Sequence, residues 1–181
     1  MTRALVPLTD GVEEMEAVIA IDVLRRAGWE VVAAGMKEEL VTASRGVRIQ
    51  PDATWDRIDP ASFDVIVLPG GAKGAETLAR DARLLAAIRE FHTAEKWLAA
   101  ICAAPIVLQA AGVLKDRNFT CHPSAVAEVT TGHRCDERVV VDGHIVTSQG
   151  PGTAFDFALT LIRLIDGEAA AARIASQMLW Q

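Results

Sequence analysis

One cysteine, Cys102, stands in the apolar segment LAAICAAPIV, between an expected strand and an expected helix. Proline is tolerated in the first turn of a helix, so Pro105 marks the helix start, and Ala103 and Ala104 are small enough for a sharp turn. A side chain at such a nucleophile elbow projects from the top of a sheet towards the positive end of the helix dipole, which favours a reactive thiolate. The alternative is a small buried hydrophobic residue, as most free cysteines are.

A carboxyl group is the first candidate partner for this thiol. Glu13, Glu14 and Glu16 lie where the first helix is expected to begin, and acidic residues there are ordinarily explained by the helix dipole and by solvation. That explanation suffices for Glu13 and Glu14. Glu16 stands between Met15 and Ala17, so we expect its carboxyl to be partly buried and to keep its proton. A neutral carboxyl can donate a hydrogen bond to a thiolate without placing two negative charges together.

A histidine is the second candidate partner. His122 follows the expected strand 118–121 and precedes Pro123, which puts it at the carboxyl edge of the strand that comes next after Cys102. An imidazole there can serve as acid or base for the thiol. A surface histidine with a backbone partner is the competing interpretation, and the sequence leaves both open.

Glycine-containing turns follow two other expected strands. Gly70 and Gly71 end the segment VIVLPGG and are either a plain turn or a source of exposed backbone N–H groups for an oxyanion hole. Gly150, Pro151 and Gly152 open a later helix and are either an anion-binding helix start or a plain turn. Neither GxGxxG nor GxxxxGK[ST] occurs, so a nucleotide site has little support.

Metal binding and disulfide formation also have weak support. Cys121 is adjacent to His122, and His133 is followed closely by Cys135, but these spacings do not fit the pairs that place two ligands on one ion. We therefore expect no metal site. Cys102, Cys121 and Cys135 make an odd number of cysteines, which indicates reduced thiols rather than a disulfide framework.

Length, charge and hydropathy restrict the class of protein. A chain of 181 residues, of which 51% are hydrophobic, is expected to form a single domain over residues 1–181. The net charge is −6 and the basic residues are scattered, which argues against a nucleic-acid partner. The apolar run near the N-terminus is too short for a signal peptide, and no segment approaches the roughly 18 apolar residues of a membrane span. We therefore expect a cytoplasmic protein.

Apolar segments alternate with segments of helical period, which predicts a doubly wound α/β fold with a mainly parallel sheet and helices on both faces. The expected strands are residues 4–8, 30–35, 65–68, 97–101, 118–121 and 145–148, and the expected helices are residues 13–27, 81–95, 103–111 and 153–166. The dipeptide Asp142-Gly143 predicts a small antiparallel edge hairpin between residues 139–141 and 144–146. Ligands of such a sheet bind beyond the carboxyl ends of its strands.

The chain resembles the ThiJ/PfpI superfamily in five segments, which occur in the family's order and spacing: RALVPLTDGVEEMEAV, DVIVLPGG, AAICAAP, CHPSA and TSQGPGTAFDFAL. Within the superfamily it is most similar to the branch of the parkinsonism-associated protein deglycase and its bacterial relatives. The resemblance runs over essentially the whole chain. It implies a flavodoxin-like fold and a homodimer, with neither cofactor nor metal. Family members are similar in having glyoxalase or protein-deglycase activity, redox sensing through cysteine oxidation or, in some cases, chaperone activity.

The resemblance also implies roles for individual residues. Cys102 matches the family's elbow cysteine, Glu16 its protonated carboxyl partner, and His122 its nearby histidine. Gly71 and Ala103 match positions whose backbone amides face the thiol.

The chain matches the family at several positions near the site and departs from it at two others. Four residues match positions that in relatives lie by the dimer interface and the mouth of the site, with solvated charge as the alternative: Ser44, Arg45, Arg25 and Arg26. Thr9 and Asp10 replace the small or basic residues usual before the glycine, and the added acid is expected to raise the pKa of Cys102. Gln50 stands where some relatives have a second oxidisable cysteine, so regulation through that position is expected to be absent.

Two functions of different class fit these residues. In the first, the Cys102 thiolate attacks the aldehyde carbon of a small 2-oxoaldehyde such as methylglyoxal or glyoxal, or an early glycation adduct. Glu16 or His122 then moves the protons that lead to a 2-hydroxy acid, as a glyoxalase or deglycase active in carbonyl and oxidative stress requires. In the second, oxidation of Cys102 to sulfinate alters partner binding or chaperone behaviour. A peptidase or amidotransferase is disfavoured, because Ala103 rather than a histidine follows the cysteine.

A homodimer is expected on independent grounds. More than half of the circumference of the first helix is apolar, which is more than packing on one sheet uses; the residues are Val18, Ile19, Ile21, Val23 and Leu24. The end of the chain is also too apolar for a free tail, with Met178, Leu179 and Trp180.

Overall fold

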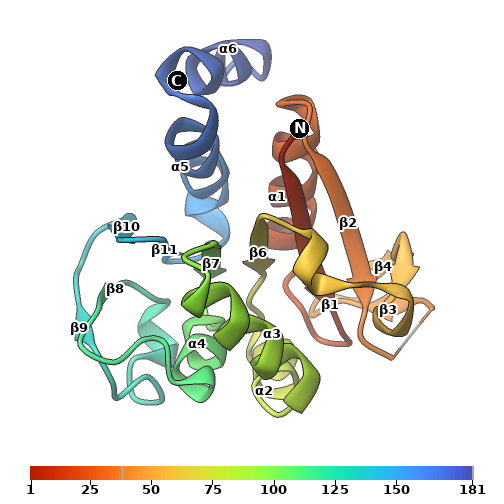
Figure 1. The fold of residues 1–181 in the computed structure, drawn as a ribbon, viewed down its shortest axis with the longest axis vertical. Coiled ribbons are helices and arrows are strands. Elements are labelled where there is room, and N and C mark those ends of the chain that lie inside the picture. Colours follow the sequence, from red (N-terminus) through yellow and green to blue (C-terminus); the bar gives the residue numbers. More distant parts are fainter. Residues whose placement is uncertain (38, 181) are drawn as a thin grey trace.

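The structure, a computed structural model, describes residues 1–37 and 39–180. Seven strands form one sheet with the order β10-β11-β7-β6-β1-β2-β5 (Figure 1). Their bounds are Arg3–Leu8 (β1), Glu30–Gly35 (β2), Ala53–Thr54 (β5), Val65–Leu68 (β6), Trp97–Ile101 (β7), Val139–Asp142 (β10) and Ile145–Ser148 (β11). Two small sheets lie outside it, one of β3 (Val41–Thr42) and β4 (Arg48–Ile49), the other of β8 (Asn118–Phe119) and β9 (His133–Arg134).

The order of the central strands confirms the expected flavodoxin-like fold. Read from β2, the order is β2-β1-β6-β7-β11, which is the 2-1-3-4-5 arrangement of flavodoxin-like sheets. All these neighbours pair in parallel, and the edge strand β10 pairs with β11 in the antiparallel direction. The chain moves outwards from β1 to β2 and then returns to β6 on the other side of β1. Such a reversal leaves a crevice at the carboxyl ends of the strands, and ligands bind there in doubly wound folds.

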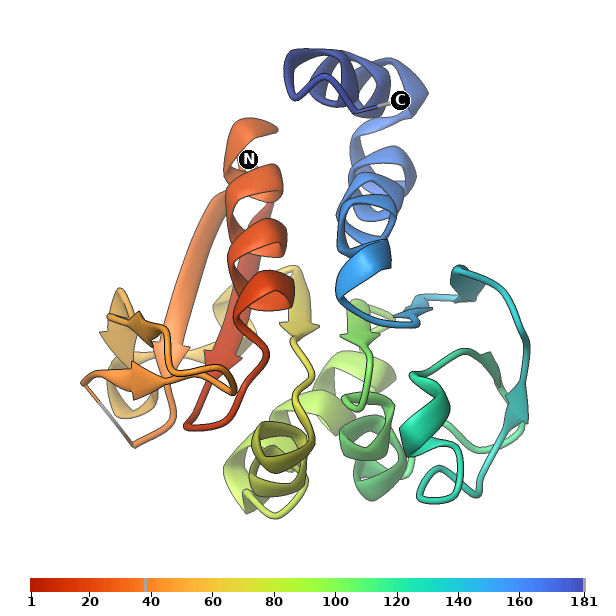
Figure 2. The same ribbon diagram turned by 180° about the vertical axis from the view of Figure 1, so that it is seen from behind.

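Six α-helices cover the two faces of the sheet. Their bounds are Glu14–Arg26 (α1), Ala72–Leu78 (α2), Ala82–Thr93 (α3), Pro105–Ala111 (α4), Ala154–Asp166 (α5) and Glu168–Gln177 (α6). Buried residues of α1, α5 and α6 share one core, and those of α2, α3 and α4 share the other. Figure 2 shows α1 and α5 side by side, with α6 continuing beyond the end of α5.

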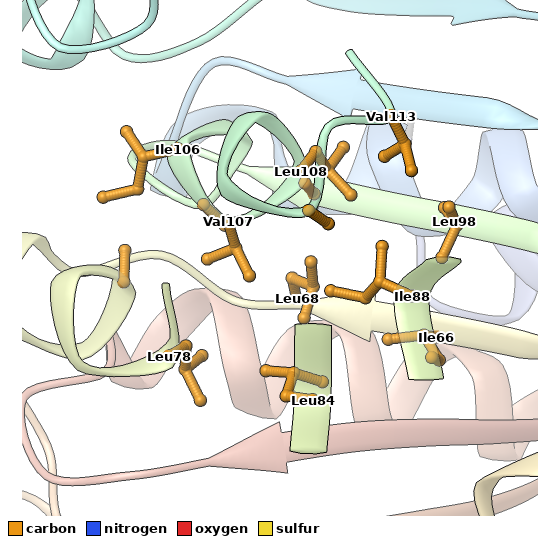
Figure 3. Close-up of a cluster of buried hydrophobic side chains, with 14 of the residues drawn as sticks. Ile66, Leu68, Leu78, Leu84, Ile88, Leu98, Ile106, Val107, Leu108 and Val113 are labelled. Atoms are coloured by element: carbon orange, nitrogen blue, oxygen red, sulfur yellow. The ribbon is translucent and has the colours of Figure 1, made fainter. Parts of the chain in front are cut away.

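Alternating side chains of each central strand enter these two cores. On β6, Leu68 belongs to the core with α3 and α4, whereas Val67 belongs to the core with α1 and α5. Figure 3 shows the first core, in which Leu68 lies among Ile88 of α3 and Val107 of α4. Burial of the central strands on both faces explains why they read as nearly continuous apolar runs.

Most of the expected elements are present with shifts of one or two residues at their ends. The expected edge hairpin is also present, but its turn is Gly143-His144 rather than Asp142-Gly143. Gly143 has a φ of +60° and occupies the first central position, where a type II′ hairpin turn favours glycine. The helices α2 and α6 and the short strands β3, β4, β5 and β9 were not expected, because each is short or lacks a clear period.

The expectation of a sheet strand over residues 118–121 is wrong. Only Asn118 and Phe119 are extended, and they pair with β9 outside the main sheet. The position beside β7 is taken by β11, so the apolar residues Phe119 and Cys121 are buried against the α2, α3 and α4 face instead. In the part of the chain that the structure describes, no helix is long and apolar enough to cross a membrane.

Removal of a core side chain should test the packing of α3. Ile88 is fully buried in the core with α2 and α4, so Ile88→Ala should lower the free energy of unfolding by about 2–5 kcal/mol through lost burial and a residual cavity. Urea denaturation measures the change. Glu90→Ala, on the exposed side of the same helix, should change it by less than about 0.5 kcal/mol. Equal effects of the two substitutions would contradict this packing.

Candidate active site at the reversal of strand order

Three loops meet at the carboxyl ends of neighbouring strands. The loop after β1 leads into α1, whose first turn carries Glu16. The loop after β6 contains Gly70 and Gly71, and Cys102 forms the turn after β7. The loops are joined by the backbone, because the Glu13 N–H donates a hydrogen bond to Gly70 O at 3.0 Å. These are the strands that flank the reversal of strand order, so the site lies in the crevice expected for this fold.

Cys102 forms a sharp turn between β7 and α4. Its φ is +65°, a left-handed conformation that is uncommon for a residue with a side chain and that is typical of strained functional turns. Its N–H donates to Ser148 O and its carbonyl accepts from the His122 N–H, each at 2.9 Å. The thiol is half-buried, and the backbone N–H groups of Gly71 and Ala103 face it. The elbow inferred from the sequence is therefore present.

Glu16 is completely buried next to this turn. Its Oε2 accepts a hydrogen bond from the Gly70 N–H at 2.7 Å, while Oε1 has no hydrogen-bond partner of good geometry among the described residues. A side chain on Gly70 would lie 2.6 Å from Cys102 Cβ and 2.8 Å from Glu16 Oε2, so only glycine lets the carboxyl and the turn come together. Gly70 thus positions the carboxyl with its N–H, and that N–H is not free for an oxyanion.

The carboxyl of Glu16 and the thiol of Cys102 compete for protons. Burial raises the pKa of Glu16 to about 7, although the hydrogen bond from Gly70 acts in the opposite direction. Burial and then the charge of Glu16 raise the pKa of Cys102 to about 12, against the N–H groups of Gly71 and Ala103. The helix dipole alone therefore does not produce the lowered thiol pKa that the sequence suggested. The pair loses its first proton near pH 7 and carries a single negative charge above it.

His122 reaches the site from a loop rather than from the edge of a sheet strand. Its Nδ1 accepts a hydrogen bond from the Ser124 N–H at 3.2 Å and lies 2.8 Å from Ser124 Oγ. With Nδ1 used as an acceptor, the neutral ring carries its proton on Nε2. The backbone of His122 is tied to Cys102, and both residues line one cleft. The imidazole is thus a group of the site, held by a neighbouring serine.

A cleft of about 760 Å³ opens at the thiol. Of the residues singled out in the sequence, it is lined by Cys102, His122, Gly71, Ala103, Ser44, Arg45 and Pro151. Gly150 is not among its lining residues, and the Gly150 N–H is occupied by Thr153 Oγ1 at 3.1 Å, so it offers no free donor for an anion. Arg25 and Arg26 pair with Asp52 and Asp22 elsewhere.

Two residues contribute more than the sequence suggested. Glu14 is buried, and its carboxylate accepts from Ser44 Oγ at 2.9 Å and the Arg45 N–H at 2.8 Å, so it holds the rim of the cleft rather than being solvated. Burial opposes ionisation of Glu14, but these hydrogen bonds outweigh it and lower the pKa. Lys73 also lines the cleft. In the sequence, the only sign of the role of Glu14 was the run of acidic residues, and the only sign of the role of Lys73 was a positive charge after the glycine pair.

Asp10 does not act as expected. It lines the cleft, but its Oδ1 accepts from the Thr42 N–H at 2.7 Å. The carboxylate that raises the pKa of Cys102 is that of Glu16. Gln50 lies outside the cleft, in a separate groove beside α1.

The other cysteines lie outside the site as well. Cys121 is buried and Cys135 is half-buried, and all three thiols are free. Within residues 1–37 and 39–180, no group of three or more His, Cys, Asp or Glu side chains is arranged to hold a metal ion.

Comparison with known proteins agrees with this architecture. Residues 2–164 match the model of the DJ-1/PfpI family. Over 91% of its length the chain is 41% identical to "Protein DJ-1 homolog B" of Arabidopsis thaliana, of which it spans 38%. It is 36% identical to "Glutathione-independent glyoxalase DJR-1.2" of Caenorhabditis elegans, with 90% of this chain and 87% of the relative covered.

Solved structures of similar proteins have the same fold throughout. The crystal structure of Drosophila melanogaster DJ-1beta matches with a TM-score of 0.96 and 39% identity, covering 99% of this chain and 98% of the other. The structure of oxidized Toxoplasma gondii DJ-1 matches with a TM-score of 0.95 and 39% identity over 99% of both chains. The chain therefore belongs to the DJ-1/PfpI family.

Proposed function

We propose that the protein is a cofactor-independent glyoxalase or deglycase that acts on small 2-oxoaldehydes, such as methylglyoxal and glyoxal, or on their early adducts. The observation that carries this proposal is the buried Glu16 carboxyl beside the half-exposed thiol of Cys102 at a strained turn. A relative named as a glutathione-independent glyoxalase supports it. The carbonyl and oxidative stress response is the proposed setting, and the cytoplasm the proposed location.

The first step is attack by sulfur. Glu16 takes the thiol proton, so that the single negative charge of the pair moves to Cys102, where the N–H groups of Gly71 and Ala103 stabilise it. The thiolate adds to the aldehyde carbon and a carbon–sulfur bond forms. The carbonyl oxygen takes up the proton that Glu16 accepted from the thiol, which gives a hemithioacetal. In deglycation the same attack releases the amine or thiol that carried the aldehyde.

The second step moves a hydrogen within the adduct. The proton on C1 is transferred to C2 and the hydroxyl proton on the C1 oxygen to the C2 oxygen, with Glu16 or His122 as the carrier, and the hemithioacetal becomes a thioester of a 2-hydroxy acid. Water then adds to the thioester and releases the acid and the thiol. One 2-oxoaldehyde and one water give one 2-hydroxy acid, so neither an oxidant nor a cofactor is needed.

A redox sensor or chaperone is the second candidate function. The half-exposed Cys102 thiol opens to a cleft that a peroxide can enter, and the similar Toxoplasma gondii structure is that of an oxidized protein. Two equivalents of peroxide convert a thiolate through sulfenate to sulfinate and are themselves reduced to water. Glu16 would then donate a hydrogen bond to a sulfinate oxygen.

We also propose that the chain is a single domain that forms a homodimer through the outward face of α1. Met15 and Val18 are each about half exposed on this helix, at 52% and 48%. Exposed apolar side chains that form a contiguous patch often mark a protein–protein contact. The C-terminal residues give weaker support, because the Trp180 ring stacks on Phe155 of its own chain at 4.8 Å.

Loss of the thiol should abolish the reaction. Cys102→Ala should lower the production of lactate from methylglyoxal by about 100-fold or more, because the attacking atom is absent. Lactate is measured enzymatically after incubation without glutathione. Cys135→Ala, which removes a thiol outside the cleft, should retain activity. Lactate production that survives Cys102→Ala would refute the enzyme proposal and leave the sensor.

The direction in which Glu16→Gln shifts the thiolate pKa shows whether sulfur or the carboxylate carries the negative charge. If sulfur carries it, thiolate absorbance at 240 nm rises with pH through about 7, the pKa at which the pair loses its first proton. Glu16→Gln should then raise the thiolate pKa, since an amide is a weaker hydrogen-bond donor than a carboxyl. Were the carboxylate to carry the charge, the same substitution would remove repulsion and lower the thiolate pKa from about 12. Titration of both proteins distinguishes the two.

If the dimer forms through α1, a charge placed on the outward face of this helix should dissociate it. Sedimentation velocity at micromolar concentration should give a dimer, and Val18→Glu should shift the population to monomer by placing a charge in the apolar contact. Val141→Glu, at a similarly exposed valine on the edge strand β10, should remain dimeric. A monomeric wild-type chain would end this proposal.

A further inference from the structure

We propose that Lys73 makes the cleft selective for 2-oxoaldehydes that carry an anionic group, with the carbonyl at Cys102 and the anion at the rim beside Lys73. This inference deepens the proposed function and rests on it for the identity of the substrate. It assigns Lys73 as a specificity-determining residue, outside the group of atoms that react.

The position of Lys73 is set by the turn that also faces the thiol. It lies in the first turn of α2, two residues after Gly71, whose N–H faces Cys102. Its side-chain stem runs along the loop after β1, since a side chain built on Gly11 would lie 2.8 Å from Lys73 Cβ and 3.1 Å from its Cδ. The stem therefore lies beside the backbone of Gly11, and the side chain as a whole lines the cleft.

Among the residues that the structure describes, Lys73 forms no ion pair with the carboxylates that share its cleft. The two acids that line the cleft with it, Asp10 and Glu13, accept hydrogen bonds from the backbone N–H groups of Thr42 and Glu16. Within the described residues, Lys73 takes part in no ion pair, in contrast to most of the arginines of the chain. Asp10 and Glu13 keep their negative charges when they accept these hydrogen bonds, so the rim holds charges of both signs. Lys73 is a cation on this rim without an ion-pair partner among the described residues.

A second unpaired cation faces the same cleft. The backbone of Arg45 is held by Glu14, and its guanidinium group forms no ion pair in the described part of the chain. The inner end of the cleft has the opposite character, because Cys102 and Glu16 carry a negative charge there. An anionic group is therefore repelled from the thiol and attracted to Lys73 and Arg45, although Asp10 and Glu13 on the same rim weaken this attraction. The two cations thus orient an anionic 2-oxoaldehyde with its carbonyl inwards.

Alkylation of Cys102 tests this charge pattern without relying on turnover. Iodoacetate and iodoacetamide are similar in size and differ in charge, so the ratio of their rates at Cys102 reports the attraction of an anion and cancels changes in thiol reactivity. Peptide mass spectrometry resolves Cys102 from the other cysteines. In Lys73→Met the iodoacetate-to-iodoacetamide ratio should fall about two- to fivefold, as expected for one partly exposed charge. The difference should shrink as salt is added.

Two control variants show whether the change in the alkylation ratio comes from the charge at position 73. Lys73→Arg should keep the wild-type ratio, and Lys115→Met, which removes an exposed lysine outside the cleft, should not change it. An unchanged ratio in Lys73→Met, or an equal fall in Lys115→Met, would overturn the proposal.

Turnover separates this inference from the proposed function. 4,5-Dioxopentanoate carries a carboxylate where 2-oxopentanal carries a methyl group, so the two form a matched anionic and neutral pair. Wild type should have the lower KM for the anion, and Lys73→Met should raise that KM about two- to fivefold with little change in kcat. Equal KM values for both substrates in wild type and in Lys73→Met would overturn the selectivity. Absence of Cys102-dependent turnover of both would refute the proposed function, while the alkylation ratio still decides the role of Lys73.

Discussion

Competition for one proton between two buried acids is the interaction on which the site depends. The Glu16 carboxyl is fully buried and the Cys102 thiol is half-buried, and neither can ionise while the other is charged without a large electrostatic cost. The protein therefore has to hold a proton between them. A carboxyl that keeps this proton turns from a source of repulsion into a hydrogen-bond donor for the sulfur. The same arrangement suits nucleophilic attack and oxidation, which explains why both proposed functions fit one site.

The fold supplies this pair by bringing three strand ends together. Parallel pairing of β1, β6 and β7 sets Glu16, Gly70 and Cys102 side by side, although the first and the last are 86 positions apart in the chain. The contact is possible because Gly70 has no side chain and Cys102 adopts a positive φ. The strained backbone of Cys102 and the missing side chain of Gly70 thus lower the stability locally. The two apolar cores that pack on the faces of the strands offset this loss.

One short acidic run performs three separate tasks. Glu13 caps α1 by accepting from the Glu16 N–H, Glu14 holds the loop that carries Arg45, and Glu16 points to the thiol. Successive residues of a helix face different directions, so neighbouring carboxyls enter different environments. Their pKa values diverge accordingly, lowered for Glu14 and raised for Glu16. The cleft therefore has a negative inner end and a rim of mixed charge, which holds Lys73 and Arg45 together with Asp10 and Glu13.

The sequence by itself determined the fold class, the central strands and the position of Cys102 at a strand-to-helix turn. Periodic apolar segments and a Cys-Ala-Ala-Pro turn are local patterns, so they can be read without coordinates. Tertiary structure alone decided that residues 118–121 leave the sheet, that Gly70 holds a carboxyl rather than an oxyanion, and that Glu14 is buried. It also decided that burial raises the pKa of the thiol where the helix dipole suggested the opposite. These features depend on desolvation and on distances between residues far apart in the chain, which no local pattern encodes.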